Sequence, residues 1–173
     1  DLDLDYEHIG KEIAPGLQRL RGTAGSGKTV LLCQKAAHMH LKHPEWDIAL
    51  VFFTRTLYDL VTELVDKWLR YFTNGEVQYE PKNNKLRIIH AWGSKEQQGL
   101  YKTICELNGV RPKGVKETKE RQPIRGLSVL CKRLVEEIKI EPIFDASLID
   151  EGQDLVDADD LQYQDKQAIY WLA

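Results

Sequence analysis

The stretch at residues 22–29 constrains the fold of this chain more than any other part of its sequence. It reads GTAGSGKT and fits the pattern G-x-x-x-x-G-K-[ST], whose glycines let the backbone curl closely around a phosphate group. A helix that follows such a loop adds the partial positive charge of its N-terminus. In this pattern Lys28 reaches the β- and γ-phosphates, and the hydroxyl of Thr29 binds Mg²⁺. We therefore predict that a nucleoside triphosphate is held by Gly22, Thr23, Ala24, Gly25, Ser26, Gly27, Lys28 and Thr29.

An alternative to a phosphate-binding loop is a chance glycine turn ahead of an ordinary helix. The flanking sequence disfavours this alternative. Strands are predicted at residues 17–21, 47–53, 86–90 and 143–149, and the apolar run DIALVFF at 47–53 is typical of a strand buried on both faces of a parallel sheet. Helical spacing is found at residues 28–41, 57–69 and 127–138, and more loosely at 91–108. Asn74-Gly75 is predicted to turn the chain. Strands that alternate with helices predict the α/β class, with a mostly parallel sheet and right-handed crossovers.

The bulk properties describe an ordinary globular chain of about one domain. The 173 residues carry a formal net charge of −3, which does not indicate a nucleic-acid binder, although local patches decide such binding. No apolar run is long enough to span a bilayer, and no signal-peptide core is evident, so no membrane partner is expected. The three cysteines, Cys33, Cys105 and Cys131, form no C-x-x-C pair and are expected to be small buried side chains in a reducing, cytoplasmic setting.

An acidic motif follows the last predicted strand. Asp150-Glu151-Gly152-Gln153-Asp154 would lie at the carboxyl end of a buried strand, where a phosphate-binding loop requires acidic groups opposite it. Asp150 is predicted to hold Mg²⁺ beside Thr29, and Glu151 to orient or deprotonate the water that attacks the γ-phosphate. A solvated strand end would look the same in isolation. The phosphate-loop pattern upstream favours the functional interpretation.

Residues 111–125 differ from the rest of the chain in being strongly basic. The stretch contains two acidic residues, Glu117 and Glu120, and six basic ones: Arg111, Lys113, Lys116, Lys119, Arg121 and Arg125. Prolines and glycines interrupt the stretch, so it is predicted to be a mobile or partner-dependent loop. Two interpretations stay open, a solvated loop and a surface that contacts a phosphate backbone.

Three histidines near the end of the first long helix invite a metal-site interpretation. Their spacing scatters His38, His40 and His43 around the helix end. Solvated surface histidines are therefore the favoured interpretation.

With GTAGSGKT and IDEGQD both considered, the chain resembles the first RecA-like, ATP-binding lobe of a UvrD-like superfamily 1 helicase. The AGSGKT form of the loop and the D-E-x-Q-D form of the acidic motif are typical of that superfamily. Residues 49–57 resemble its motif Ia, with Thr54-Arg55 in place of the usual end. Residues 88–94 resemble motif Ib, with His90 and Trp92 at the matching positions.

The resemblance implies a three-layer P-loop NTPase domain with a mostly parallel sheet flanked by helices. It implies that Lys28, Glu151 and Gln153 act in ATP hydrolysis, with Gln153 sensing the γ-phosphate, and that Thr29 and Asp150 bind Mg²⁺. It also implies that single-stranded DNA or RNA runs along Thr54, Arg55, His90 and Trp92. Packing beneath a loop is an equal alternative for Trp92.

The resemblance further predicts that residues 1–173 are a single lobe of a larger helicase, with a small, mostly helical subdomain inserted at 93–140. The family's second RecA-like lobe, which carries the arginine fingers, is expected as a partner. Arginine fingers contribute roughly 10³–10⁵-fold to phosphoryl-transfer rates, so this chain alone is expected to hydrolyse ATP slowly and to unwind nothing. The alternatives are an ATP-gated nucleic-acid binding module and another P-loop NTPase.

Overall fold

The computed structural model describes the backbone at residues 16–21, 27–52, 55–91, 93, 99–119, 121, 123–137, 143–151, 162–163 and 166–167. The chain divides into two compact units, which we call unit 1 (Asp1–Ile88 with Phe144–Gln153) and unit 2 (Ile89–Ile143 with Asp154–Ala173). No helix in the described ranges is long and apolar enough to cross a membrane.

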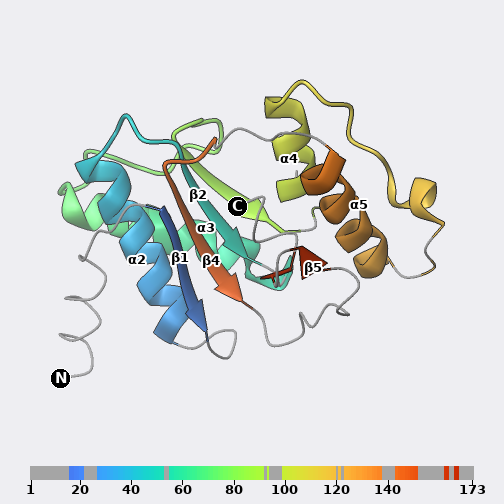
Figure 1. The fold of residues 1–173 in the computed structure, drawn as a ribbon. Helices are drawn as coiled ribbons and strands as arrows, with labels where there is room; N and C mark the ends of the chain where they lie inside the picture. The colour runs from blue at the N-terminus through green and yellow to red at the C-terminus, as the bar shows by residue number, and fades with distance from the viewer. Residues whose placement is uncertain are drawn as a thin grey trace. The chain divides into compact units, whose positions relative to one another are not determined.

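Unit 1 is built on a sheet whose neighbouring strands are distant in the sequence (Figure 1). The strands are β1 (Gly16–Arg21), β2 (Ile48–Phe52), β3 (Leu86–His90) and β4 (Ala146–Glu151), and their order in the sheet is β1-β4-β2-β3. Strand β4 pairs in parallel with both β1 and β2, so that Leu20 and Phe52 both lie opposite Asp150. The predicted α/β class with a parallel sheet is confirmed.

The apolar run that predicted a doubly buried strand forms β2. All five of its residues are buried, and it lies between β4 and β3 in the sheet. A strand that is covered on both faces has no solvent side, which is why its sequence shows no polar alternation. The prediction is confirmed for 48–52; Phe53 lies outside the described residues.

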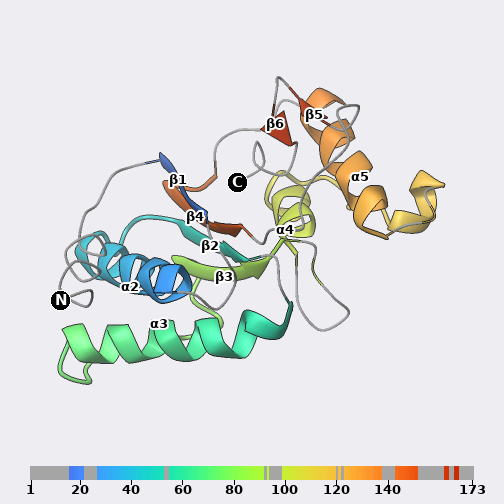
Figure 2. The same cartoon turned by 90° about the horizontal axis from the view of Figure 1, so that it is seen from below.

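Two long helices cover the same face of this sheet (Figure 2). They are α2 (Gly27–Lys42) and α3 (Tyr58–Phe72), and the 3₁₀-helix η1 (Arg55–Leu57) leads into α3. One apolar core joins them to the strands through Leu32, Ala36, Met39, Val61, Val65, Leu69, Leu50, Phe52, Leu86 and Leu148. Full burial of each large aliphatic side chain contributes about 1.5–3 kcal/mol, so this core is the main stabilising feature of unit 1.

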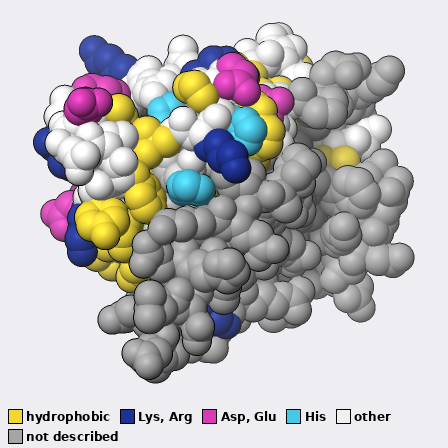
Figure 3. Space-filling model, turned by 90° about the vertical axis from the view of Figure 1, so that its left-hand side faces the viewer, with side chains coloured by type: hydrophobic (Ala, Val, Ile, Leu, Met, Phe, Trp, Pro, Cys, Tyr) yellow, Lys and Arg dark blue, Asp and Glu magenta, His cyan; other side chains and the backbone are white. Residues whose placement is uncertain are grey.

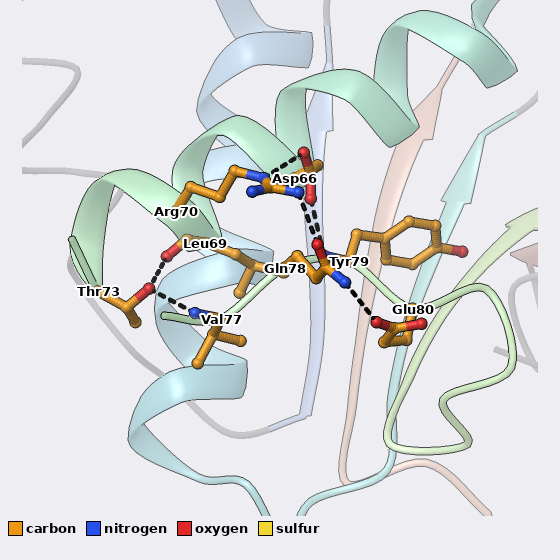
Figure 4. A network of polar contacts seen from close by, with 8 residues as sticks. All are labelled: Asp66, Leu69, Arg70, Thr73, Val77, Gln78, Tyr79 and Glu80. Atoms are coloured by element: carbon orange, nitrogen blue, oxygen red, sulfur yellow. Dashed lines mark hydrogen bonds and ion pairs between the residues drawn. The ribbon is translucent and has the colours of Figure 1, made fainter. Parts of the chain in front are cut away.

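The chain reverses direction directly after α3, as the Asn74-Gly75 pair predicts. Both residues have positive φ, 52° for Asn74 and 85° for Gly75, which these residue types tolerate. Thr73 supports the turn, because its hydroxyl donates to the Leu69 carbonyl at 2.7 Å and accepts the Val77 N–H at 2.9 Å (Figure 4). The helix therefore ends at a turn that is hydrogen-bonded on both sides.

Beyond the turn, the returning segment is attached to α3 by a carboxylate (Figure 4). Asp66 accepts the backbone N–H of Tyr79 at 2.9 Å and the Nε–H of Arg70 at 2.9 Å. Arg70 also donates to Gln78 at 2.7 Å, and Gln78 donates to Glu80 at 2.9 Å. Partial desolvation acts to raise the pKa of Asp66, but the hydrogen bonds from Tyr79 and Arg70 and the charge of Arg70 outweigh it and lower that pKa.

The strands begin together at the amino edge of the sheet. Asp145 accepts the Asp47 N–H at 2.7 Å and donates its own N–H to the Asp47 carbonyl at 2.8 Å. Lys85 reaches the Asp47 carboxylate at 3.2 Å, and its carbonyl accepts the Ile48 N–H at 2.9 Å. These contacts set the starts of β2, β3 and β4, and therefore where each of these strands ends at the opposite edge.

Unit 2 is mostly helical in its described part. It contains α4 (Leu100–Leu107), the 3₁₀-helix η2 (Val115–Thr118), α5 (Pro123–Glu137) and the short antiparallel pair β5 (Gln162–Tyr163) and β6 (Lys166–Gln167). Helix α5 contacts both α4 and η2. The predicted insertion at 93–140 lies within this unit.

Two predictions for this region differ from the structure. Helix α5 starts at Pro123, a few residues before the predicted start at 127. Proline is favoured in the first turn of a helix because no intrahelical partner exists there for the missing N–H, so Pro123 opens α5 and does not interrupt it. The basic stretch predicted as a loop contains η2 as well as the start of α5.

Candidate functional site

The parallel register brings the ends of three strands to one edge of the sheet in unit 1. Asp150 on β4 lies opposite Leu20 of β1 and Phe52 of β2, and Glu151 lies opposite Arg21. Helix α2 begins at Gly27, shortly after the end of β1. The first turn of α2 and the end of β4 therefore meet at the carboxyl edge, where ligands of open α/β sheets bind.

A buried hydrogen bond joins these two elements. The Thr29 hydroxyl donates to Asp150 Oδ2 at 2.8 Å, and the two residues are only 2% and 7% exposed. Burial raises the pKa of Asp150, and the hydrogen bond from Thr29 offsets part of that rise. The site thus holds a carboxyl group whose ionised form is poorly solvated.

Cys33 lies one helical turn after Thr29 on α2, near enough to Asp150 for the carboxylate charge to act on its thiol. Its thiol points toward the Val61 carbonyl at 3.9 Å. Burial raises the pKa of the Cys33 thiol far above its usual range, and the charge of Asp150 raises it further. Cys33 is therefore a neutral apolar neighbour of the carboxylate, and the i, i+4 spacing from Thr29 is the sequence signal that could have placed it there.

The chemistry of the pair fits a hard divalent cation. Hydroxyl and carboxylate oxygens are the ligands that Mg²⁺ prefers, and Mg²⁺ is commonly bound by one or two protein oxygens while keeping several waters. A cation would also relieve the unfavourable burial of the Asp150 charge. Within the described ranges, no cluster of three or more His, Cys, Asp or Glu residues could hold a metal ion. The oxygens of Thr29 and Asp150 are nevertheless close enough together to hold such a cation.

The rest of the predicted phosphate loop is described only in part. Gly27 is exposed at the start of α2 and Lys28 is half-buried in its first turn. Gly22 to Ser26 and Gln153 lie outside the described residues, as does the side chain of Glu151. Their predicted roles stay predictions.

The predicted nucleic-acid contacts are also only partly described. Thr54 and Trp92 lie outside the described residues, and Arg55 is described only by its backbone at the start of η1. His90 is 2% exposed, and its Nδ1 accepts the Gly93 N–H at 2.9 Å. Since Nδ1 is the acceptor, Nε2 carries the proton in the neutral ring. His90 supports the turn at Gly93, where φ is 73°, and its contact with a nucleic acid stays a prediction.

The histidines at the end of α2 have separate packing partners. His43 stacks on Trp46 with ring centroids 3.9 Å apart, and His38 meets the Phe72 ring edge-on at 5.4 Å. His40 is 3.4 Å from the Asn83 amide, and burial lowers the pKa of His40. Figure 3 shows the histidine side chains of this face separated by other groups. They are half-buried and not fully solvated as predicted, because Phe72 packs against His38, Trp46 against His43, and Asn83 lies beside His40. His43 also lies 3.6 Å from the carboxylate of Glu45.

The cysteines agree with their predicted character. Cys33, Cys105 and Cys131 are all buried.

Comparison of the chain with protein-family models, with curated proteins and with solved structures finds no match.

Proposed function

We propose that this chain is the ATP-binding and hydrolysing lobe of a superfamily 1 helicase or translocase that acts on single-stranded nucleic acid. The Thr29–Asp150 hydrogen bond of 2.8 Å carries the proposal. It joins the last residue of the phosphate-loop pattern to the first residue of the acidic motif, and these are 121 positions apart in the chain. Two motifs that each indicate nucleotide chemistry therefore meet at the carboxyl edge of a parallel sheet.

Nucleotide binding would use the backbone N–H groups of residues 22–28 and the start of α2. These groups donate to phosphate oxygens, and the helix N-terminus adds partial positive charge. Lys28 would neutralise the β- and γ-phosphates. Thr29 and Asp150 would hold Mg²⁺, which screens phosphate charge when bound.

Hydrolysis would depend on the residues that follow Asp150. Glu151 is the candidate to orient or deprotonate the attacking water, since it comes directly after the metal ligand at the end of β4. Gln153 would report the presence of the γ-phosphate to the surface that holds the nucleic acid. The three-layer RecA-like fold, the second lobe and the DNA or RNA strand are parts of this proposal.

The binding half of the proposal is tested by calorimetry of Mg-ATP with two variants. We expect Lys28→Ala to abolish detectable binding, with Lys67→Ala, an exposed lysine on α3, as the matched control. We expect Thr29→Val to weaken binding and Thr29→Ser to retain it, because the hydroxyl is the needed group. Thr103→Val is the control for losing a buried threonine hydroxyl, since Thr103 is 5% exposed and donates to the Gly99 carbonyl at 2.9 Å. Unchanged affinity in Lys28→Ala and Thr29→Val would refute the site.

The catalytic half is tested in a protein that contains both lobes. Glu151→Gln should leave Mg-ATP binding intact and remove turnover. ATP turnover of the unaltered protein should rise when single-stranded DNA or RNA is added. Absence of stimulation by either polymer would reject the translocase and leave a nucleotide-binding module.

A further inference from the structure

The linker between α4 and α5 presents a row of cations to solvent. Arg111, Lys113, Lys116, Lys119 and Arg121 are all exposed, and we call them the basic ridge. Glu117 is the acid described within this stretch, and it is 3.6 Å from the Arg111 guanidinium, whose side chain is 84% exposed. The ridge therefore carries a local excess of positive charge on a chain whose formal net charge is −3.

Several contacts restrain the middle of the ridge. The Lys113 N–H donates to the Tyr101 hydroxyl at 3.2 Å, and Tyr101 is a buried residue of α4. The Gly114 N–H donates to Glu117 at 3.0 Å, which caps η2, and Thr118 is 7% exposed at its end. Helix η2 also contacts α5. Because the backbone at Lys113 and Lys116 is held by these contacts, binding an anion there requires less ordering of the chain.

Lysines recur at every third position of this segment. Lys113, Lys116 and Lys119 are all exposed. Lys116 lies in η2, Lys119 is its C-cap residue, and Lys113 precedes the N-cap residue Gly114. The segment therefore exposes three cations over a short stretch of chain.

Lys119 has a backbone conformation that does not suit its residue type. Its φ is 63°, in the left-handed region, whereas the other described residues with positive φ are Asn74, Gly75, Gly93 and Gly109. A residue with a Cβ is disfavoured there by roughly 1–2 kcal/mol, and glycine or asparagine is the usual choice. The lysine at this position is not explained by the stability of the turn. Its exposed charge, three positions after that of Lys116, gives a reason for its presence.

We propose that the basic ridge binds the phosphate backbone of a nucleic-acid strand independently of base sequence. This inference rests on the proposed function for the choice of partner. A group of exposed cations suits a polymer of phosphates, because contacts between Lys or Arg and phosphate dominate the affinity for such a strand. A membrane surface is disfavoured, because the exposed large apolar residues in the described part of the chain (Val30, Leu60, Tyr71 and Leu107) all lie outside the ridge.

The test is fluorescence anisotropy with a labelled oligothymidylate, in the absence of nucleotide and across a range of salt concentrations. We expect the double variant Lys116→Gln/Lys119→Gly to bind more weakly, with the slope of log K against log salt shallower by roughly 1.4, since each lost contact with a single strand removes about 0.7. The control is Lys67→Gln/Lys82→Gln, which removes two exposed lysines of unit 1. An unchanged slope in the ridge variant, or the same change in the control, would overturn the proposal.

The single variant Lys119→Gly separates binding from folding. Glycine accepts the left-handed conformation, so we expect the melting temperature to be unchanged or raised while the slope becomes shallower by roughly 0.7. Vesicles of phosphatidylserine provide the remaining comparison. If the ridge lysines govern vesicle binding and leave oligonucleotide binding unaffected, the nucleic-acid inference is wrong. Because no ATP is present, these results do not depend on whether the nucleotide site is correct.

Discussion

Two aspartates of unit 1 show how different environments give the same side chain different uses. Asp66 on α3 accepts hydrogen bonds from the Tyr79 N–H and the Arg70 guanidinium, and these lower its pKa. Asp150 on β4 accepts one from the neutral hydroxyl of Thr29, and burial raises its pKa. At Asp66 the hydrogen bonds and the arginine charge outweigh the cost of burying the carboxylate, which holds the turn after α3 in place. At Asp150 the hydrogen bond from Thr29 does not outweigh that cost, as is expected of a group arranged to receive a cation.

The largest expected effect comes from removing the charge of Asp150. The variant Asp150→Asn keeps the size of the side chain and an oxygen that accepts from Thr29. We expect Mg-ATP affinity to fall by about 10- to 100-fold, which corresponds to the 1.5–3 kcal/mol typical of a charge-assisted contact. Calorimetry with and without Mg²⁺ measures this, and an equal fall in both conditions would argue against a metal role.

Although Asp150→Asn should bind Mg-ATP more weakly, we expect it to be more stable than the unaltered chain. Removing a buried, poorly solvated charge from a functional site commonly raises stability by about 0.5–2 kcal/mol. Urea denaturation in the absence of Mg²⁺ and ATP measures the free energy of unfolding. A clear loss of stability in Asp150→Asn would show that the carboxylate is structural and would remove the contrast with Asp66.

Asp66→Ala is expected to destabilise unit 1 by about 1–2 kcal/mol and to leave Mg-ATP affinity unchanged. The loss combines one backbone hydrogen bond, worth about 0.5–1.5 kcal/mol, with an i, i+4 ion pair, worth about 0.3–0.5 kcal/mol. Urea denaturation gives the first quantity and calorimetry the second. Weaker Mg-ATP binding in this variant would mean that the turn after α3 influences the site.

The pH dependence of stability should have opposite signs at the two carboxyl groups. The pKa of Asp66 is lower in the folded chain than in the unfolded chain. Its contribution to stability is therefore fully present above the unfolded-chain pKa of about 3.9, and it is lost as pH falls through the folded-chain pKa. The pKa of Asp150 is higher in the folded chain than in the unfolded chain. Its contribution to stability is therefore fully present below the unfolded-chain pKa of about 3.9, and it is lost as pH rises through the folded-chain pKa. Denaturation of the wild-type chain, Asp66→Asn and Asp150→Asn between about pH 2 and 7 tests this. As pH rises, the free energy of unfolding of Asp66→Asn should fall further below that of the unaltered chain. That of Asp150→Asn should rise further above it.

The smallest effect is expected for Arg70→Lys. The lysine keeps the charge beside Asp66 but cannot also donate from a rigid fork to Gln78. Side chains here are 48% exposed for Arg70 and 34% for Asp66, so the loss should be only about 0.2–1 kcal/mol and should diminish at high salt. A loss independent of salt would indicate that packing of the arginine stem matters more than its charge.

Local sequence patterns predicted much of this fold. The apolar run at 48–52 formed a doubly buried strand, and Asn74-Gly75 formed the reversal after α3. Both outcomes depend on properties of adjacent residues, namely continuous hydrophobicity and tolerance of positive φ. The start of α5 was missed because Pro123 is read as an interruption unless its place in the first turn is known.

Contacts between distant segments could not be derived in the same way. The attachment of Tyr79 to Asp66 depends on where the chain returns after its turn, and the burial of His90 depends on packing around the end of β3. The spacing of Cys33 from Thr29 indicates a shared helix face, but the nearness of Asp150 to that face follows only from the sheet order β1-β4-β2-β3.

The sequence by itself determined the chemistry available to this protein: a phosphate-loop pattern, an acidic motif after a buried strand, and a basic stretch between two helices. The tertiary structure decided which of these groups meet and in what state. Parallel pairing of β4 with β1 and β2 brings Asp150 to Thr29 and buries both, which raises the pKa of the carboxyl group. Hydrogen bonds from Lys113 to Tyr101 and from Gly114 to Glu117 restrain the backbone of the basic stretch. The reason is the same in both cases, because burial and hydrogen bonding depend on neighbours that the linear sequence does not specify.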